Sequence, residues 1–474
     1  MTIGAEHIER LSTLLGPQGL LTRPADIVSY ESGARYDGGR AAFVARPASI
    51  EAVSQAVAYC VRNAIALVPQ AGNTGLVGGS TPDVSGVQGV LSLDRLRSTF
   101  ELDTDNRSLR VDAGFRLSEI NARLEQHGLF FPIDLGADPM AGGMAATNTG
   151  GARFLRFGDV RRNTLSLKLV LADEQGTVLE CGTGLRKDNT GPDWKQLFIG
   201  TGGAFGIVTE CTFNLERLPK QTATAYLVPR GCAEALPLLH EIEERAGTYV
   251  SAFEGMSGQA ILNALAHVPS LRNPFPGGDI PAYVILVELS RSWAQRAGEQ
   301  PLDAVLEEIL ADIWELPGGL LLDAFIGAPS EMWALRHSLS EGAKAAGYVV
   351  GLDLAFRRGE VMRFRERMVA MLADEFPQTE ICDFGHIGDG GVHFNLVVPR
   401  DPDGGVDIDL ATRLRTYVTE IAVEEHRGSF SAEHGLGRRN QHFYDRYTSQ
   451  RLKQMAAQFR QATSPGAVGA VRLG

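Results

Sequence analysis

Three glycine-rich segments in the first half of the chain constrain its fold most strongly. They cover residues 70–80 (QAGNTGLVGGS), 133–151 and 200–209 (GTGGAFGIVT), and the first follows an apolar stretch typical of a β-strand. Glycine has no Cβ, so consecutive backbone N–H groups in such a loop can converge on an anion. One such loop alone is also compatible with a long turn. The three together predict a cofactor with a pyrophosphate, threaded between two small α/β lobes.

Two common nucleotide motifs do not describe these segments. Residues 70–80 lack the lysine of a nucleotide-triphosphate loop. Residues 200–209 have the spacing GxGxxxG and lead into an apolar strand, whereas a dinucleotide fingerprint leads into a helix. The sequence therefore argues against both a triphosphate loop and a Rossmann domain.

Length and charge limit the remaining choices. A chain of 474 residues is too long for one hydrophobic core, so we expect two or three domains. The net charge of −12 argues against nucleic acid or an anionic membrane as a partner, because both need clustered Lys and Arg. The sequence contains no window of about 18 uninterrupted apolar residues, so we expect no membrane span.

The N-terminus and the cysteines predict a cytoplasmic protein. Residues 1–22 alternate charged and apolar residues, which indicates an amphipathic helix and no secretion signal. The five cysteines are scattered and form no CxxC, which fits a reducing compartment and excludes a cysteine-ligated iron–sulfur cluster of usual spacing. They are Cys60, Cys181, Cys211, Cys232 and Cys382.

Alternating strand and helix patterns run along most of the chain, among them a strand over 41–46 with a helix after it and a helix near 329–346. Pro219 and Lys220 mark a boundary after the third glycine-rich segment. We expect a domain of two α/β lobes over residues 1–218, a second domain over 219–428, and a C-terminal segment over 429–474.

A second cluster of motifs carries metal-binding side chains. His386 and His393 lie seven residues apart around an Asp-Gly-Gly turn, which suits a hairpin that brings both imidazoles to one side. The candidate third ligand lies in SAEHGLG (431–437), where Glu433 and His434 are adjacent, so that one can ligate while the other faces a substrate. Two histidines and a carboxylate form a common set for a zinc-like ion. The alternative is structural: the histidines cap a hairpin and Glu433 begins a helix.

The glycine-rich motifs carry a family resemblance. PQAGNTGLVGGS, DPMAGGMAATNTGG with RFGD after it, and LFIGTGGAFGIVTE resemble the FAD domain of the vanillyl-alcohol oxidase (p-cresol methylhydroxylase) superfamily. The resemblance implies an α+β fold, with a two-lobed FAD-binding domain over 1–218, an α+β substrate or cap domain holding the metal site over 219–428, and a C-terminal segment returning to the FAD domain. No His or Cys lies in residues 70–80 to attach the flavin, so we expect non-covalent FAD.

The resemblance also implies which residues contact FAD, with its pyrophosphate on residues 70–80. These are Gln70, Gly72, Asn73, Thr74, Gly75, Leu76, Gly79, Ser80, Asp134, Gly142, Gly143, Thr147, Asn148, Gly150, Gly151, Gly200, Gly203, Gly206, Ile207 and Val208.

GHxGDGxxH followed by AEHGxG resembles the D-2-hydroxyglutarate and D-lactate dehydrogenases of this superfamily. The resemblance implies that His386, His393 and Glu433 hold a divalent metal, with Zn²⁺ favoured, that Asn395 contacts the substrate and that His434 is the general base. The chemistry is coherent: a metal acidifies the 2-hydroxyl, a neutral imidazole takes its proton, and hydride leaves C2 for the flavin N5.

A third segment, WALRHSLSE at 333–341, resembles a helix that binds the substrate carboxylate in this family. The resemblance gives that role to Arg336, whose fork suits a carboxylate. Ser340 lies four residues on, on the same helical face. An arginine on a helix is otherwise often solvated.

Three departures from the family pattern bear on the substrate. Gly351 stands where members that bind a second carboxylate carry lysine, and Arg357 and Arg358 lie near enough in sequence to compensate. Pro192 replaces a usual tyrosine, and the terminal NPG is missing.

The sequence therefore predicts an FAD- and metal-dependent dehydrogenase of a D-2-hydroxy acid, with D-2-hydroxyglutarate or D-malate favoured and D-lactate as the alternative. Two other readings stay open. A metal-dependent hydrolase leaves the glycine-rich segments unexplained, and a catalytically silent flavin-binding subunit leaves His434 unexplained. A quinone, an electron-transfer flavoprotein or a cytochrome all fit as electron acceptor, and a homodimer is compatible with the sequence.

Overall fold

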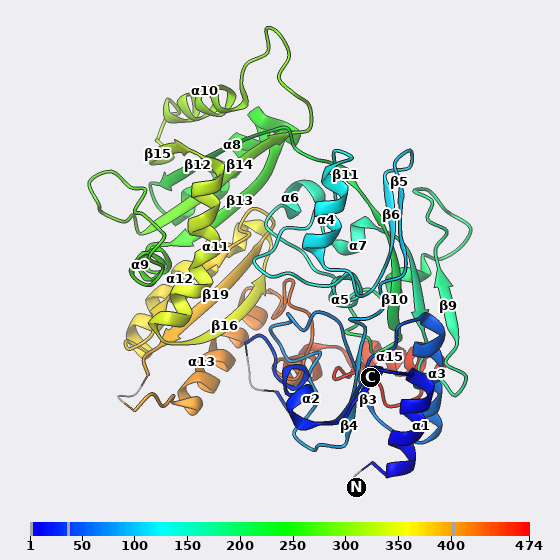
Figure 1. Ribbon diagram of the computed structural model, residues 1–474. Coiled ribbons are helices and arrows are strands. Elements are labelled where there is room, and N and C mark those ends of the chain that lie inside the picture. The colour runs from blue at the N-terminus through cyan, green and yellow to red at the C-terminus, as the bar shows by residue number, and fades with distance from the viewer. Residues whose placement is uncertain (1–2, 36–37, 401–402) are drawn as a thin grey trace. The chain divides into compact units, whose positions relative to one another are not determined.

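A computed structural model describes residues 3–35, 38–400 and 403–474 (Figure 1). The chain forms two compact units. The first contains residues 1–150, 158–218 and 433–474, and the second contains residues 151–157 and 219–432. Relative to the expected domains, the short stretch 151–157 joins the second unit, and the C-terminal segment of the first unit begins at Glu433. Both units combine helices and sheets, which confirms the predicted α+β class.

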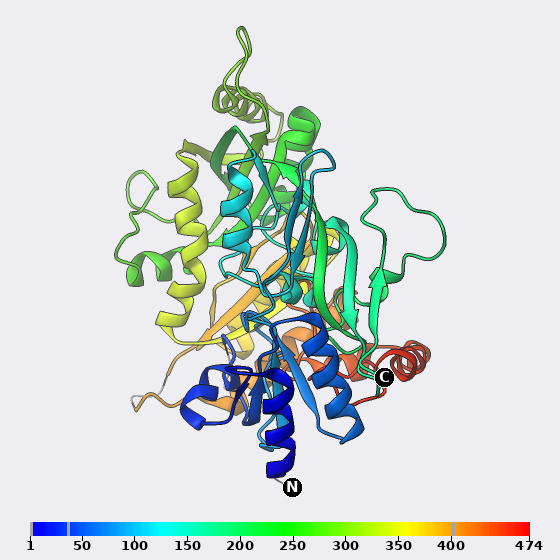
Figure 2. The ribbon, with the colours of Figure 1, turned by 45° about the vertical axis from the view of Figure 1, so that its right-hand side comes forward.

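The first unit begins with a small four-stranded sheet. Its strand order is β1 (Leu20–Leu21), β2 (Ala41–Ala45), β4 (Gln88–Ser92) and β3 (Leu67–Gln70). Strand β4 is parallel to both β2 and β3, so helix α3 (Ile50–Arg62) serves as a crossover. Ser49 caps this helix, because its side chain accepts a hydrogen bond from the Ala52 amide. Helix α1 (Ala5–Leu15) lies beside α3 (Figure 2).

The second lobe of the first unit is built on an antiparallel sheet. Its order is β5 (Phe100–Asp103), β6 (Ser108–Asp112), β10 (Ile207–Asn214), β8 (Thr164–Val170) and β9 (Val178–Cys181). Helix α4 (Leu117–Glu125) contributes Ile120 and Leu124 to its core. Phe459, on the C-terminal helix α15 (Gln450–Thr463), packs against Phe198 and Phe205. The C-terminal segment is thereby part of this lobe.

Residues 133–163 contain the second glycine-rich segment and the chain that follows it. Three short helices form there: α5 (Ala141–Thr147), α6 (Phe154–Phe157) and α7 (Val160–Asn163). Tertiary contacts hold α5, since Gly142 donates to the Ala113 carbonyl and Gly200 donates to the Ala145 carbonyl. Helices this short are not stable from propensity alone.

The second unit contains an eight-stranded antiparallel sheet. The order is β15 (Leu321–Gly327), β12 (Gln221–Pro229), β14 (Tyr283–Arg291), β13 (Val250–Ser257), β18 (Phe384–Gly385), β19 (Gly391–Val398) and β16 (Tyr348–Ala355), and β17 (Glu380–Ile381) also pairs with β19. One face packs against α8 (Ala235–Ala246), α10 (Leu302–Trp314), α12 (Val361–Glu375) and α13 (Ile408–Glu420). The other packs against α9 (Gly258–His267) and α11 (Pro329–Ala346).

Alternation along β16 and β19 gathers polar side chains on one face of this sheet. Leu352 and Phe394 belong to the core under α8, α10, α12 and α13. Asp353, His393 and Asn395 alternate with these apolar residues, so they lie on the opposite face, which α9 and α11 partly cover.

The outer edge of β16 is closed by chain from outside the sheet. The carbonyl of Ala355 accepts a hydrogen bond from the Ser429 amide at 2.7 Å, and that of Asp353 accepts one from the Ala432 amide at 3.2 Å. The Gly351 carbonyl accepts one from Arg415 Nη1 at 2.9 Å. Covering an edge in this way satisfies backbone groups that would otherwise pair with another chain. It also fixes residues 429–432, which directly precede Glu433 and His434.

A buried carboxylate stabilises the second unit away from these polar residues. Glu288, on β14, accepts two hydrogen bonds from Arg153 at 2.8 and 2.9 Å, one from Ser251 and one from Trp333. Burial alone would raise the pKa of the Glu288 carboxyl, but these partners lower it below its usual range.

Replacing Glu288 by glutamine should therefore destabilise the protein by about 2–4 kcal/mol at pH 7, because Arg153 loses its counter-ion and a buried acceptor is lost. A folded-state pKa below the unfolded one contributes stability above the unfolded pKa and loses it as pH falls through the folded pKa. Urea unfolding should therefore show the difference shrinking below about pH 4. A constant difference down to pH 2 would contradict this account.

No helix among the described residues is long and apolar enough to cross a membrane. All five cysteines are free thiols, and burial raises the pKa of Cys60 and Cys382 to about 12.

Candidate functional site

The loop after β3 presents a row of backbone amides. Among the described residues, no backbone N–H from Ala71 to Ser80 donates a hydrogen bond. Side chains within the loop hold its shape instead. The side-chain Nε2 of Gln70 donates to the Ser80 backbone carbonyl at 2.8 Å, and the Ser80 hydroxyl donates to Asn73 Oδ1 at 2.9 Å. Asn73 adopts a left-handed φ of 53°. The loop therefore fits a pyrophosphate, while Gln70, Asn73 and Ser80 serve to order it.

The chain after His434 packs on this same loop. Arg438 Nη1 donates to the carbonyls of Gly78 (3.1 Å) and Thr81 (2.6 Å), and the Arg439 amide donates to the Val77 carbonyl at 3.1 Å. The approach is close, since a Cβ added at Gly79 would lie 2.8 Å from the Leu436 carbonyl oxygen. The sequence analysis did not single out Arg438, because this arginine belongs to no recognised motif and its only local signal is the glycine before it.

The second and third glycine-rich segments pack against each other within the first unit. The Gly202 amide donates to the Ala146 carbonyl at 2.8 Å. Asn148 is left-handed, with φ 52°, and its side chain binds Asp159 and the Arg161 amide. Ile207 and Val208 lie buried at the start of β10. These contacts bring the second and third glycine-rich segments together within the first unit.

The remaining predicted cofactor residues have varied surroundings. A Cβ at Gly142 would meet Ala113, and one at Gly206 would touch Leu171 and Phe198. Asp134 is half-buried in the loop before α5. Gly150 ends the first stretch of the first unit, and Gly151 begins the stretch that belongs to the second unit.

Four side chains form a row across the second unit's sheet, in the order Glu254 (β13), His386 (just after β18), His393 (β19) and Asp353 (β16); His393 is half-buried and the other three are buried. We call this set the cross-strand row. Asp353 pairs directly with His393 in the register, and His386 follows Gly385, which pairs with Gly255. Each histidine therefore has a carboxylate beside its Nδ1: Glu254 Oε1 at 2.7 Å from His386 and Asp353 Oδ1 at 3.5 Å from His393.

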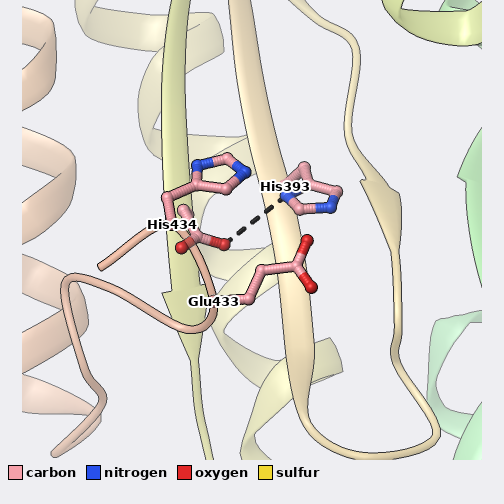
Figure 3. Close-up of side chains that lie close together, drawn as sticks. His393, Glu433 and His434 are labelled. Carbon is pink, nitrogen blue, oxygen red and sulfur yellow. Dashed lines mark ion pairs between the residues drawn. The ribbon is translucent and has the colours of Figure 1, made fainter. Parts of the chain in front are cut away.

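The candidate metal-binding group contains Asp353, His393, Glu433 and His434, whose ligand atoms all lie within 4.8 Å of one another. Figure 3 shows Glu433 and His434 on one loop and His393 on a neighbouring strand. Two imidazoles and two carboxylates suit a zinc-like divalent ion. His386 is not in this group, although its ring centroid lies 5.2 Å from that of His393. The group instead includes Asp353, for which the sequence predicted no role.

The three predicted substrate residues lie in different surroundings. Arg336, on α11, is buried, and its Nη2 and Nε lie 2.6 and 2.8 Å from Glu254 Oε2. Among the described residues, its Nη1 makes no hydrogen bond. Asn395 is buried on the same sheet face as His393, and its Nδ2 donates to the His393 carbonyl at 3.3 Å. Ser340 is exposed, and no described contact brings it to Arg336.

Glu254 is the more deeply buried of the two carboxylates in the cross-strand row. Complete burial would raise the pKa of its carboxyl, but the charges of His386 and Arg336 and their hydrogen bonds outweigh burial and lower the pKa to about 2. The carboxylate is therefore ionised at neutral pH. Its only signal in the sequence is a lone acidic residue in an apolar strand, VSAFEGMS, and Asp353 shows the same signal in YVVGLDLA.

Comparisons with known proteins cover both units. Residues 41–182 match the model of an FAD binding domain, and residues 218–466 match the model of the C-terminal domain of FAD linked oxidases. A mitochondrial D-2-hydroxyglutarate dehydrogenase of Rattus norvegicus is 36% identical, over 83% of this chain and 70% of the relative. A Schizosaccharomyces pombe protein named as a mitochondrial D-lactate dehydrogenase is 31% identical, over 92% of this chain and 83% of the relative.

One solved structure illustrates the fold. The substrate-bound crystal structure of p-cresol methylhydroxylase is similar with a TM-score of 0.71 at 14% identity, over 97% of this chain and 94% of that one. The likeness confirms the predicted vanillyl-alcohol oxidase type of fold.

Proposed function

We propose that this chain oxidises a D-2-hydroxy diacid with the help of a divalent metal. The chain belongs to the FAD-dependent D-2-hydroxyglutarate and D-lactate dehydrogenase family of the vanillyl-alcohol oxidase superfamily, and it is an FAD-dependent hydroxy acid dehydrogenase. The observation that carries the proposal is the group of Asp353, His393, Glu433 and His434, with its ligand atoms within 4.8 Å of one another. A flavin-only reaction gives no reason for such a set.

Each residue of the site has a stated task. Bound FAD supplies the hydride acceptor, and a bound divalent cation supplies a Lewis acid for the 2-hydroxyl. His386, His393 and Glu433 are the proposed ligands, with Asp353 as a further candidate. His434 takes the hydroxyl proton, since a neutral imidazole is a base near pH 7. Arg336 directs Nη1 at the C1 carboxylate, and Asn395 contacts the substrate from β19.

The second carboxylate of a diacid needs its own cation. Arg357 and Arg358, which the sequence offered for this, are both exposed, and Arg358 pairs with Glu243 at 3.0 Å. That compensation therefore has no support. Arg415 is half-buried and already hydrogen-bonds the Gly351 carbonyl. A D-2-hydroxy monoacid such as D-lactate remains the second candidate, favoured by Gly351 itself.

The two substrate classes separate in one experiment. With one acceptor, kcat/KM should be higher for D-2-hydroxyglutarate or D-malate than for D-lactate, since the relatives named for D-2-hydroxyglutarate include the 36% identical protein. Arg357→Ala should leave all three values unchanged, because the Arg357 side chain is exposed. A D-lactate value above both diacids would reject the diacid proposal.

We further infer that FAD is held without a covalent bond. The loop from Gln70 to Ser80 contains neither His nor Cys, the residues that could attach a flavin covalently. Its backbone amides can hold the cofactor only through hydrogen bonds. Acid precipitation should release yellow FAD into the supernatant. Flavin that stays with the protein pellet would contradict this inference.

The cellular setting stays a prediction. We propose a cytoplasmic location, no nucleic-acid partner and an acceptor among the quinones, electron-transfer flavoproteins and cytochromes, with a homodimer as a candidate assembly. Fractionation of the source cells would test the location, since several relatives are named as mitochondrial.

A further inference from the structure

We propose that Glu254 is a positioning residue for this reaction. One carboxylate orients two groups at once: the His386 imidazole toward the metal and the Arg336 guanidinium toward the substrate carboxylate. The inference rests on the proposed function, because it takes His386 as a ligand and Arg336 as the anchor.

The geometry gives each oxygen of Glu254 a different partner. Oε1 lies 2.7 Å from His386 Nδ1, while Oε2 accepts a hydrogen bond from Arg336 Nε at 2.8 Å and lies 2.6 Å from Arg336 Nη2. The Glu254 side chain is 1% exposed, so water does not compete for these oxygens. The Arg336 guanidinium also lies over the Phe384 ring, 4.9 Å from its centroid. All of these groups belong to the second unit.

The contact with Oε1 selects one form of the imidazole. A carboxylate beside Nδ1 holds the proton on that nitrogen, so Nε2 carries the lone pair that a metal needs. The negative charge also makes the imidazole a stronger donor. Outer carboxylates of this kind change metal affinity by about 10–100-fold when they are removed.

The contacts with Oε2 fix the plane of the guanidinium. Nε and Nη2 share one oxygen, and Phe384 lies against one face, so the direction of Nη1 is set before a substrate arrives. Preorganising an arginine fork in this way lowers the ordering cost of binding a carboxylate. One side chain would thereby orient both the proposed metal ligand and the substrate anchor.

The same sheet offers a matched control. Glu288, on the adjacent strand β14, is also buried, ionised and paired with an arginine, Arg153. None of its hydrogen-bond partners is a proposed metal ligand. Losing either carboxylate removes a buried charge, but only Glu254 touches His386.

The test is zinc affinity of the FAD-loaded enzyme, measured after metal removal by competition with a colorimetric zinc chelator. Glu254→Gln should weaken Zn²⁺ binding by about 10–100-fold. Glu288→Gln should bind Zn²⁺ like the wild type, although urea unfolding shows it destabilised. Glu254→Asp, which keeps the charge but withdraws it by one methylene, should also bind Zn²⁺ more weakly and serves if Glu254→Gln does not fold.

The outcomes separate this inference from the proposed function. A wild-type enzyme that binds no zinc overturns both the metal-dependent function and the role of Glu254. Wild-type zinc binding with unchanged affinity in the Glu254 variants overturns the positioning role alone. Equal losses in Glu254→Gln and Glu288→Gln also overturn it, because they would reflect general loosening of the sheet.

Discussion

Replacing His434 by alanine should slow flavin reduction by the hydroxy acid by about 10²–10⁴-fold, the usual loss when an acid–base group is removed. His434 belongs to the group that also holds Asp353, His393 and Glu433, so its imidazole would be within reach of a substrate hydroxyl held at that group. FAD should stay bound, because the loop amides from Ala71 to Ser80 do not involve this side chain.

Anaerobic stopped-flow spectroscopy at 450 nm, a flavin absorption band, would measure this rate. The matched control is His442→Ala, an exposed histidine eight residues further on, which should reduce the flavin normally. Zinc content should be measured in both variants. A normal rate in His434→Ala would place the base elsewhere, and a loss of zinc would make His434 a ligand.

Removing the metal should slow flavin reduction at least as strongly as the His434→Ala substitution. A strong chelator should abolish flavin reduction while FAD remains bound, since the proposed ligands and the glycine-rich loop use different residues. Zn²⁺ should restore the rate, and Mn²⁺ or Co²⁺ are the next candidates for this donor set. Glu433→Ala should mimic the chelator by losing metal affinity.

The control for chelation is the ultraviolet–visible spectrum of the treated enzyme, which shows whether flavin has been lost as well. A metal-free enzyme with full activity would remove the roles given to His386, His393 and Glu433, and would leave the hydroxy acid dehydrogenase assignment intact.

Elements with a strong local pattern could be predicted from the sequence. The strand over 41–46 and the following helix appear as β2 and α3, and the predicted helix over 329–346 is α11. The Asp-Gly-Gly turn forms the expected hairpin, in which Phe384 pairs with His393. Period-two and period-3.6 patterns are local, so they survive without knowledge of the tertiary fold.

The partners of the predicted site residues could not be found in this way. Glu254 and His386 are 132 residues apart in sequence, and only the pairing of β13 with β18 brings them together. The same holds for Asp353 opposite His393. Ser340 is exposed although Arg336 is buried, because helical spacing alone does not decide which side chain packs against the sheet.

The contact between residues 77–81 and 436–439 has a consequence for anyone who diversifies this enzyme. Glycines 75 and 136 have open space where a Cβ would lie, whereas a Cβ at Gly437 would run into the Val77 carbonyl and one at Gly79 into the Leu436 carbonyl. Saturation libraries over residues 70–80 and 436–439 would therefore lose most of their members at Gly79 and Gly437. The permissive positions are the ones that face no neighbouring chain, and the two intolerant ones are separated by more than 350 residues of sequence.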